Sequence, residues 1–432
     1  MRPQPDAALA SLAEVLQRHL GEERDERGPT AKERVAAFLD APPRELAVVQ
    51  AEVAATHEPS LAHALEALVD AHDAATLHGA SPYEEAPARR RLDLGDEDRF
   101  VPADCVATWP SGTLHPDVPL AAVKTAVASP ATEPSALLRV IGPPGARQAA
   151  EEGLGRLRAH AEGPSNLLRG RVLRARDERG LTLAPVPRPT ATRADLVLPD
   201  AVWQAVDRGV GNVFARRGAL EAAGVPASRG LLLQGPPGTG KTTLSRVLAA
   251  EAAGEATVVL ADAPSAVRRL GELQRELDIL APMLLIIEDL ELLTGGRSGR
   301  GERGGALPTL LAGLDALHRS AQGGVVTVVT ADEPDRVDPS LPRAGRIDEV
   351  LTLAPPDLED RTRILQRLLE PLDLAEPALV SQLAHHTTGS TGAELVGLCR
   401  GAILAAEGPP TREDLLAAVR SDEGPANLGT YL

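Results

Sequence analysis

The residues best suited to chemistry lie between Gly235 and Thr242, where the chain reads Gly-Pro-Pro-Gly-Thr-Gly-Lys-Thr. This run fits the P-loop pattern G-x-x-x-x-G-K-[S/T] at every fixed position, and a simple Gly/Pro turn would not explain the adjacent Lys and Thr. Glycines let backbone N–H groups approach phosphate oxygens, and the N-terminus of the helix that follows favours anions. Lys241 is therefore expected to reach the β- and γ-phosphates of ATP, and the Thr242 hydroxyl to hold Mg²⁺. The predicted nucleotide-binding residues are Gly235, Pro236, Pro237, Gly238, Thr239, Gly240, Lys241, Thr242 and Thr243.

A second candidate site is the pair of carboxylates, Glu288 and Asp289, that ends the apolar run Met283–Ile287. In P-loop ATPases, one carboxylate at this place orients Mg²⁺ and its waters, and the next polarises the attacking water. Acids can also end a strand simply because that end is solvated. The position of this pair downstream of a P-loop, among alternating strands and helices, favours the functional interpretation.

The apolar patterns predict the elements that must position these residues. Strand and helix candidates alternate through the middle of the chain, as a parallel α/β sheet requires. Beyond Pro355 the pattern becomes helical. We therefore predict a P-loop NTPase α/β subdomain at residues 191–355 and a C-terminal helical lid at residues 356–432. The expected strands are 231–233, 257–260, 284–287 and 325–330, and the expected helices are 243–253, 266–280, 361–369, 377–385, 393–407 and 412–419.

The chain before the nucleotide-binding region is predicted to have two parts. Residues 1–90 are expected to form an N-terminal helical region, because their leucines and valines recur at spacings of three and four as far as about residue 80. Residues 91–190 are expected to form a small α/β region and a linker. The strand candidates in this second part are 137–141, 167–175 and 182–186, and its helix candidate is 147–161.

The composition restricts the class of protein. The 432 residues are 43% hydrophobic and 25% charged, which is typical of soluble globular domains. The net charge of −16 argues against tight, non-specific nucleic-acid binding. Cys105 and Cys399 belong to no zinc-binding pattern, and a reducing cytoplasm is the default expectation. The sequence shows neither a signal peptide nor an apolar stretch long enough to span a membrane.

At residues 191–420 the chain resembles the AAA family of ATPases, within the AAA+ superfamily. The resemblance rests on three stretches: the approach to the P-loop from Gly224 to Gln234, the segment from Pro334 to Asp348, and Thr388–Leu395 in the lid. The lid stretch adds Gly392 and Ala393 to the expected nucleotide-binding residues.

The segment around Pro334–Asp348 carries the most specific part of the resemblance. In the family, two arginines spaced by three project from one subunit toward the γ-phosphate bound by its neighbour, where they stabilise charge on the transferring group. The matching residues here are Arg343 and Arg346. The alternative is that both arginines form surface salt bridges.

The chain departs from the family pattern in the order of its strand-end acids and in the residue after the next strand. The usual order is Asp then Glu, whereas here Glu288 precedes Asp289. This order resembles the branch that includes the mitochondrial AAA translocase of the Rieske iron–sulfur protein and its bacterial relatives. It implies that Glu288, with Thr242, serves Mg²⁺ and that Asp289 activates water. The position that is usually Asn in the family is Asp332, which could still bind the attacking water but adds negative charge near the γ-phosphate.

Two segments bear on the substrate. Family members that thread polypeptides usually carry an aromatic residue after the second strand, but the corresponding segment here, Ala261–Arg269, has none. The Gly/Arg-rich segment Gly295–Gly305 could face a central pore or could simply be solvated. The sequence contains no H-E-x-x-H zinc-protease motif.

The resemblance implies a cytoplasmic Mg-ATP-hydrolysing enzyme that forms a homo-oligomeric ring, most often a hexamer. Its leading function is the remodelling or disassembly of a protein partner, whose identity would be decided by residues 1–190. The alternative is a hydrolysis-poor, ATP-dependent switch or scaffold. A nucleic-acid motor is disfavoured by the acidic charge balance.

Overall fold

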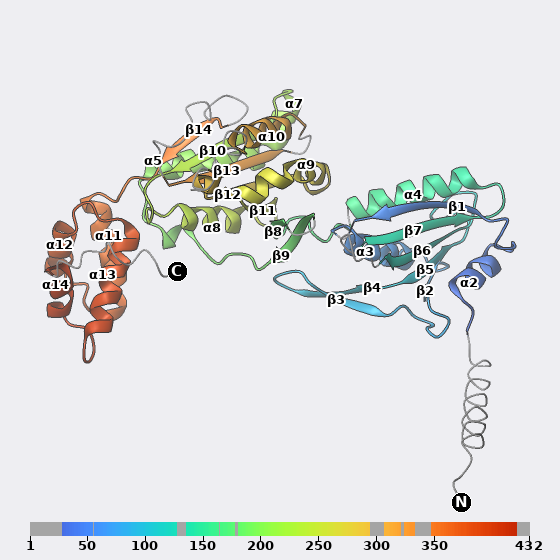
Figure 1. Ribbon diagram of the computed structural model, residues 1–432, viewed down its shortest axis with the longest axis horizontal. Coiled ribbons are helices and arrows are strands. Elements are labelled where there is room, and N and C mark those ends of the chain that lie inside the picture. Colours follow the sequence, from blue (N-terminus) through green and yellow to red (C-terminus); the bar gives the residue numbers. More distant parts are fainter. Residues whose placement is uncertain are drawn as a thin grey trace, which may run out of the picture. The chain divides into compact units, whose positions relative to one another are not determined.

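The computed structural model shows a chain that forms two compact units, Met1–Leu167 and Leu168–Leu432. Figure 1 draws the elements of both units. The structure describes residues 28–54, 56–127, 135–163, 165–177, 180–293, 306–320, 324–332 and 347–420. Among the helices of these residues, none combines the length and the apolar character needed to cross a bilayer.

The first unit contains a five-stranded antiparallel sheet in the order β1-β7-β6-β5-β2. Successive residues of its strands face opposite sides, so Leu120 and Ala122 join the core under helices α3 and α4, whereas Ala121 and Val123 pack with α2. A separate hairpin pairs β3 with β4. The elements are α2 (Ala31–Phe38), β1 (Ala47–Val53), α3 (Glu58–Asp70), β2 (Thr76–Gly79), β3 (Arg89–Asp93), β4 (Asp98–Pro102), β5 (Cys105–Trp109), β6 (Leu120–Val127), β7 (Ser135–Gly142) and α4 (Arg147–Glu162).

This unit differs from the predicted helical region at residues 1–90. Helices α2 and α3 are present, but β1 and β2 lie in the same stretch and pair with strands far along the chain. The Ala- and Val-rich sequence of β1 is compatible with a helix or a strand. The segment forms a strand because it pairs with β7. The first part of the predicted helical region, residues 1–27, lies outside the described residues.

The second unit begins with a seven-stranded sheet in the order β14-β10-β13-β12-β11-β8-β9. All pairs are parallel except β8 with β9. Within β12, Leu284 and Ile286 pack in the core with α8, whereas Leu285 and Ile287 pack in the core with α9 and α10. Burial on both faces explains why this strand is a continuous apolar run. The strands are β8 (Val172–Asp177), β9 (Leu181–Val186), β10 (Ser228–Gln234), β11 (Thr257–Asp262), β12 (Met283–Glu288), β13 (Val325–Ala331) and β14 (Glu349–Thr352).

The helices of the second unit include a four-helix lid, in agreement with the predicted fold class. A short 3-10 turn at Leu290–Leu293 follows β12, and another at Glu370–Leu372 follows α11. The lid has its own core, formed by residues such as Leu365, Leu383 and Leu395. The helices are α5 (Asp200–Val206), α6 (Asn212–Ala215), α7 (Arg217–Ala222), α8 (Lys241–Ala252), α9 (Ala263–Leu280), α10 (Ala306–Ser320), α11 (Leu358–Leu369), α12 (Pro377–His386), α13 (Gly392–Ala405) and α14 (Arg412–Arg420).

The strands β8 and β9 were expected in a separate small region at residues 91–190. Both strands form, but β8 pairs in parallel with β11, so the hairpin extends the nucleotide-domain sheet. A local pattern of apolar residues predicts that a strand forms, whereas its partner is set by the tertiary fold. The second unit therefore starts at Leu168 rather than near residue 191.

Candidate active site

The predicted phosphate loop joins β10 to α8 in a conformation that requires glycine. Gly238 and Gly240 have φ values of +82° and +101°, which residues with a side chain rarely adopt. A Cβ atom added to Gly238 would lie 2.8 Å from both Thr391 Oγ1 and Ala393 Cβ of the lid. The Ala393 N–H also donates to the Gly238 carbonyl over 3.1 Å. The lid thus contacts the loop directly at a glycine.

A cavity of about 810 Å³ lies against this loop. The phosphate loop, the ends of β12, β13 and β14, the segment before α5, and lid helices α11 and α13 all contribute to its wall. The volume and the mixed apolar and polar lining suit a nucleotide-sized ligand. The predicted site residues that line the cavity are Pro237, Gly238, Thr239, Gly240, Lys241, Thr242, Thr243, Asp289, Asp332, Gly392 and Ala393.

Lys241 is the buried cation of the site. Its ammonium donates to the Gly235 carbonyl over 2.7 Å and to the Pro236 carbonyl over 3.0 Å. The same nitrogen lies 2.6 Å from Asp332 Oδ1, and the Lys241 side chain is only 8% exposed. Gly235 and Pro236 therefore act through their backbone oxygens rather than as part of the cavity wall.

Asp289 follows β12 in a left-handed conformation, with a φ of +61°. Asp tolerates this region better than most residues, because its short polar side chain can form local hydrogen bonds. Burial raises the pKa of Asp289, the Asp332 carboxylate adds to the effect, and Lys241 opposes it. Because its pKa is raised, the Asp289 carboxylate is a stronger proton acceptor than the carboxylate of an ordinary Asp.

Glu288 occupies a different place from Asp289. It continues the alternation of Leu284 and Ile286, whose side chains face α8, and it is not among the described residues that line the cavity. Burial and the neighbouring Asp289 raise the pKa of Glu288, whereas Arg174 and Arg246 lower it. Arg246 lies one turn after Thr242 on α8, so Glu288 feels the charge of a residue on that helix.

The donor atoms fit Mg²⁺ held together with a nucleotide. Among the residues that the structure describes, no group of three or more His, Cys, Asp or Glu side chains could hold a metal ion. Mg²⁺ usually binds through one or two carboxylates, waters and substrate phosphates rather than in a complete protein cage. The residues that would hold the ion in such an arrangement are Thr242, through its hydroxyl, and Glu288, through its carboxylate.

Several cavity residues were missed by the sequence analysis. Leu196, Val202, Ile364 and Leu368 form an apolar part of the wall, and Thr330 lies next to Asp289 and Asp332 in the lining. In the sequence, these apolar positions look like ordinary core residues. They become a binding surface only when α11 and the segment before α5 come together.

No loop separates β11 from α9 within Ala261–Arg269, the segment that lacks an aromatic residue. Asp262 ends β11 and Ala263 begins α9, and the Asp262 carboxylate accepts hydrogen bonds from the Ser265 backbone N–H and hydroxyl over 2.8 and 2.9 Å. This carboxylate satisfies one of the N–H groups that the first turn of a helix leaves free. The strand therefore passes directly into the helix.

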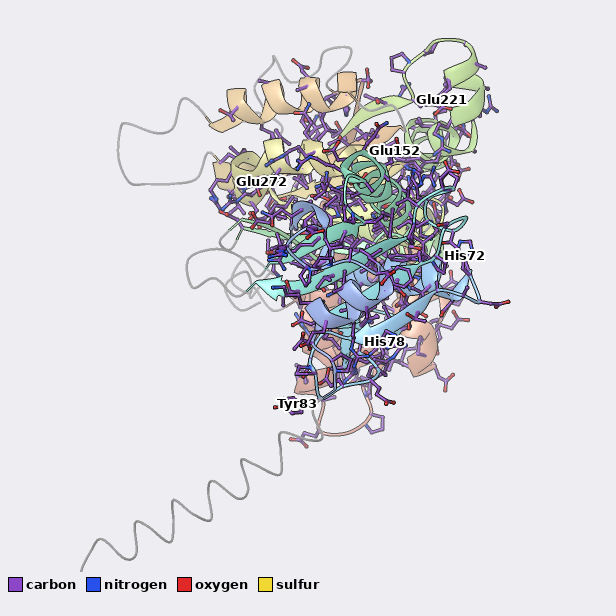
Figure 2. All side chains as sticks on the ribbon, turned by 90° about the vertical axis from the view of Figure 1, so that its right-hand side faces the viewer. His72, His78, Tyr83, Glu152, Glu221 and Glu272 are labelled. Carbon is purple, nitrogen blue, oxygen red and sulfur yellow. The ribbon has the colours of Figure 1, made fainter. Side chains whose placement is uncertain are left out.

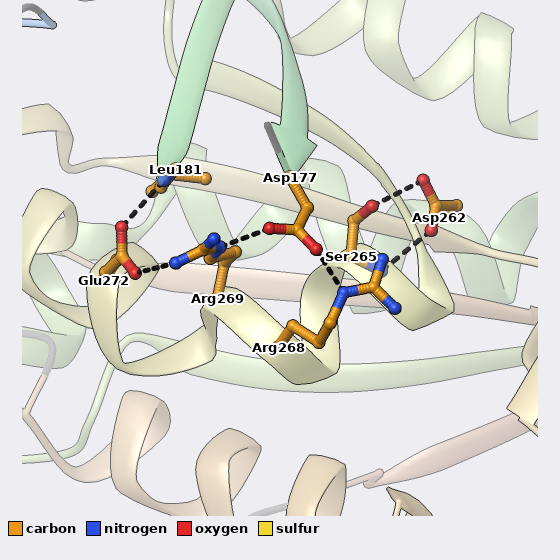
Figure 3. A network of polar contacts seen from close by, with 7 residues as sticks. All are labelled: Asp177, Leu181, Asp262, Ser265, Arg268, Arg269 and Glu272. Carbon is orange, nitrogen blue, oxygen red and sulfur yellow. Dashed lines mark hydrogen bonds and ion pairs between the residues drawn. The ribbon is translucent and has the colours of Figure 1, made fainter. Parts of the chain in front are cut away.

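The start of α9 is tied to the β8–β9 hairpin (Figure 3). Asp177 accepts hydrogen bonds from Arg268 and from Arg269, with the Arg269 Nε 2.6 Å from Asp177 Oδ1. At the other end of the hairpin turn, the Leu181 N–H donates to Glu272 Oε2 over 2.7 Å. The two arginines are thus engaged with the hairpin. Arg343, Arg346 and the segment Gly295–Gly305 lie outside the described residues.

Comparisons with known proteins agree with this geometry. Residues 231–354 match the family described as "ATPase family associated with various cellular activities (AAA)". Similar proteins include human ATPase family gene 2 protein homolog B, 36% identical over 197 residues, which cover 44% of this chain and 26% of the relative. Others are the Archaeoglobus fulgidus cell division cycle protein 48 homolog, 33% identical over 198 residues (43% and 26%), and the Symbiobacterium thermophilum ATP-dependent zinc metalloprotease FtsH 1, 34% identical over 203 residues (44% and 34%).

These matches span roughly a quarter to a third of the relatives' own lengths. The family match at residues 231–354 includes the phosphate loop, the acids at the end of β12 and part of the cavity lining. The chain therefore carries an ATPase domain of the AAA family.

Proposed function

We propose that this protein is a ring-forming AAA+ ATPase that hydrolyses Mg-ATP to remodel or disassemble a protein partner. The observation that carries the proposal is the contact between lid and phosphate loop, where the Ala393 N–H meets the Gly238 carbonyl. A lid that touches the loop can respond to the phosphates bound there, so occupancy of the cavity can be converted into motion of α13.

The hydrolytic step assigned to the site is attack of water on the γ-phosphate. Asp289 accepts the proton of the water as its oxygen bonds to phosphorus. The bond between phosphorus and the β–γ bridging oxygen breaks, and ADP and phosphate are released. Lys241 meets the β- and γ-phosphates, and Thr242 and Glu288 would hold Mg²⁺. When bound, Mg²⁺ neutralises phosphate charge and orders the surrounding waters.

The choice of partner is assigned to residues 1–190. The first unit ends at Leu167, and β8, the first strand after it, belongs to the nucleotide-domain sheet. The large exposed side chains of the first unit include Tyr83, which is 71% exposed and projects into solvent (Figure 2), and Phe100, which is 53% exposed. Exposed aromatic residues are favoured at protein interfaces. The partner is a protein rather than nucleic acid, and the compartment is the cytoplasm.

The direct passage of β11 into α9, without an aromatic residue, supports remodelling that does not thread the partner through a pore. From the order Glu288-Asp289 we also infer kinship with the branch that contains the mitochondrial Rieske-protein translocase.

A ring, most often a hexamer in this family, follows if Arg343 and Arg346 act on ATP bound to a neighbouring subunit. The test mixes an Arg346→Ala chain with a Lys241→Ala chain, each expected to be inactive alone. In a mixed ring, some interfaces combine an intact phosphate loop with an intact arginine, so hydrolysis should return. Parent activity per chain should also fall on dilution. Specific activity that is flat with concentration, together with no rescue in mixtures, would overturn the ring.

The second candidate function is a hydrolysis-poor switch or scaffold, which the ion pair between Lys241 and Asp332 favours. Single-turnover hydrolysis separates the two candidates. A remodelling machine should convert bound ATP to ADP within one binding lifetime, whereas a switch should release ATP unchanged.

A further inference from the structure

The contact between Lys241 and Asp332 joins the cation of the phosphate loop to the residue after β13. The two side chains are 2.6 Å apart, and Asp332 is 33% exposed on the cavity side. The Asp332 backbone N–H donates to Glu291 Oε2 over 3.2 Å, which fixes the chain at this point. Asp332 is thus held against the ammonium that is expected to meet the γ-phosphate.

The surroundings of Lys241 carry an excess of negative charge. Asp289 also lines the cavity and interacts electrostatically with both Asp332 and Lys241. Glu291, which accepts the Asp332 N–H, interacts electrostatically with both Asp332 and Asp289. Lys241 is the cation that directly contacts Asp332 among the ion pairs of the described residues. If Lys241 turns to a phosphate, the Asp332 carboxylate loses its partner in a site that is partly screened from water.

ATP and ADP make different demands on this pair. The β-phosphate, common to both, can take the place of one of the two backbone carbonyls that Lys241 contacts, and the remaining N–H donors of the ammonium can still meet Asp332. The γ-phosphate draws Lys241 away and brings its own negative charge toward the Asp332 carboxylate. Like charges at such short range repel strongly in a low-dielectric site. The penalty falls on ATP alone.

We propose that Asp332 is a specificity-determining residue that makes the site bind ADP more tightly than ATP. This inference rests on the proposed function, since it concerns the same nucleotide site. Asn would have nearly the same shape and could donate a hydrogen bond to a phosphate oxygen, so the negative charge is the feature that sets the preference. The protein would then hold ADP until a change at the site, such as the approach of a further cation, offsets Asp332.

The experiment measures the dissociation constants of Mg-ADP and of a non-hydrolysable Mg-ATP analogue for the full-length protein. The parent should bind ADP more tightly. Asp332→Asn should lower the ratio of the ATP-analogue constant to the ADP constant by about tenfold or more, which corresponds to about 1.4 kcal/mol. Asp332→Ser, which is neutral but shorter, should change the ratio in the same direction and guards against a misfolded Asn variant.

Glu291→Gln is the matched control, because it removes an equal charge next to Asp332 without touching Lys241. It should change the ratio less than about threefold. The inference is overturned if both Asp332 variants keep the parent ratio, or if Glu291→Gln changes it as much as Asp332→Asn. If the parent binds neither nucleotide, the proposed function itself fails. That outcome is distinct from a failure of the inference about Asp332, in which both nucleotides bind but their ratio does not depend on Asp332.

Discussion

The backbone N–H of Asp289 donates to Thr330 Oγ1 over 3.0 Å, which joins the end of β12 to the end of the neighbouring strand β13. Asp289 needs this support because its φ of +61° is unfavourable for a residue with a side chain. Both residues line the cavity. The Thr330 hydroxyl on β13 therefore fixes the backbone of Asp289, the proposed proton acceptor, at the end of β12.

The first prediction removes this hydroxyl. Thr330→Val keeps the shape of the side chain but leaves the partly buried Asp289 N–H without its acceptor, at a cost of about 1–3 kcal/mol. Turnover should fall by about tenfold, while nucleotide affinity stays within about threefold of the parent. The control is Thr327→Val on the same strand, whose hydroxyl lies 3.0 Å from His318 Nε2 in the core. It should lower stability without lowering turnover per folded molecule, and an equal loss of turnover in both variants would contradict the role of Thr330.

The second prediction separates the two acids after β12. Asp289→Asn should keep ATP binding and lose turnover by about 10²–10⁴-fold, because it removes a general base. Glu288→Gln should in addition weaken the dependence of the reaction on Mg²⁺. Both are measured from steady-state rates over a Mg²⁺ titration. If Glu288→Gln alone stops hydrolysis and leaves the Mg²⁺ dependence intact, the two roles are the reverse of those proposed.

Much of the nucleotide-domain fold could be predicted because its signals are local. The phosphate loop is one continuous run, and the buried strands β12 and β13 are apolar throughout. Lys241, Asp289 and Asp332 could therefore be placed near one another from the sequence alone. Their pairing could not, since the 2.6 Å contact between Lys241 and Asp332 depends on side-chain positions at the ends of two strands.

The parts that sequence analysis missed depend on contacts between distant segments. Ile364 and Leu368 belong to an amphipathic helix, and only the tertiary fold shows that they line the cavity. Strand β8 was expected as a strand, but its pairing with β11 is a long-range choice. Strand β1 was expected as helix because its Ala and Val content is compatible with both.

The third prediction concerns the contact between lid and phosphate loop. Gly238→Ala places a Cβ where φ is +82° and where Thr391 Oγ1 and Ala393 Cβ would be 2.8 Å away. The backbone strain alone costs about 1–2 kcal/mol, and the lid must move away, so ATP affinity should fall by about tenfold. Isothermal titration measures the loss. The control is Gly397→Ala in lid helix α13, where an added Cβ meets no atom within 4 Å and should stabilise the helix by about 0.5–1 kcal/mol. Unchanged affinity in Gly238→Ala would contradict the coupling.

The fourth prediction concerns acid stability of the hairpin clamp. Hydrogen bonds from Arg268, and to a smaller extent from Arg269, lower the pKa of Asp177 below its ordinary value of 3.8. The folded state therefore favours the carboxylate, so its stabilisation is complete above about pH 4 and is lost as the pH falls through the lower folded pKa. Asp177→Asn should increase hydrogen exchange in α9 at pH 7 and at pH 5, and the difference from the parent should shrink toward pH 3.

The matched control for the clamp is Asp98→Asn in the first unit. Arg91 lowers the pKa of Asp98 in the same way, but this pair joins β3 to β4 within the first unit, whereas α9 belongs to the second. Exchange in α9 should therefore equal that of the parent at every pH. A difference between Asp177→Asn and the parent that persists undiminished at pH 3 would show that the carboxylate charge is not what holds α9.

The fifth prediction concerns a buried ion pair in the first unit. Lys124 of β6 and Glu58 of α3 are in contact, and their side chains are only 1% and 9% exposed. Glu58 also binds Arg90, whose side chain is 50% exposed. Glu58→Gln therefore leaves Lys124 buried without a counterion and should cost about 3–5 kcal/mol of unfolding free energy. Lys124→Met should cost less, because Arg90 still neutralises Glu58.

The two tryptophans of the chain allow this difference to be measured in the first unit alone. Trp109 is fully buried there, and Trp203 lies in the second unit with Arg193 over its ring at 4.9 Å. In a Trp203→Phe background, urea unfolding followed by tryptophan fluorescence reports the surroundings of Trp109. Arg90→Ala serves as the control and should cost less than Glu58→Gln, because the Arg90 side chain is half exposed and water screens its attraction to Glu58. A Lys124→Met variant that is less stable than Glu58→Gln would contradict the argument, since the cost would then come from lost packing of the lysine stem rather than from an uncompensated buried charge.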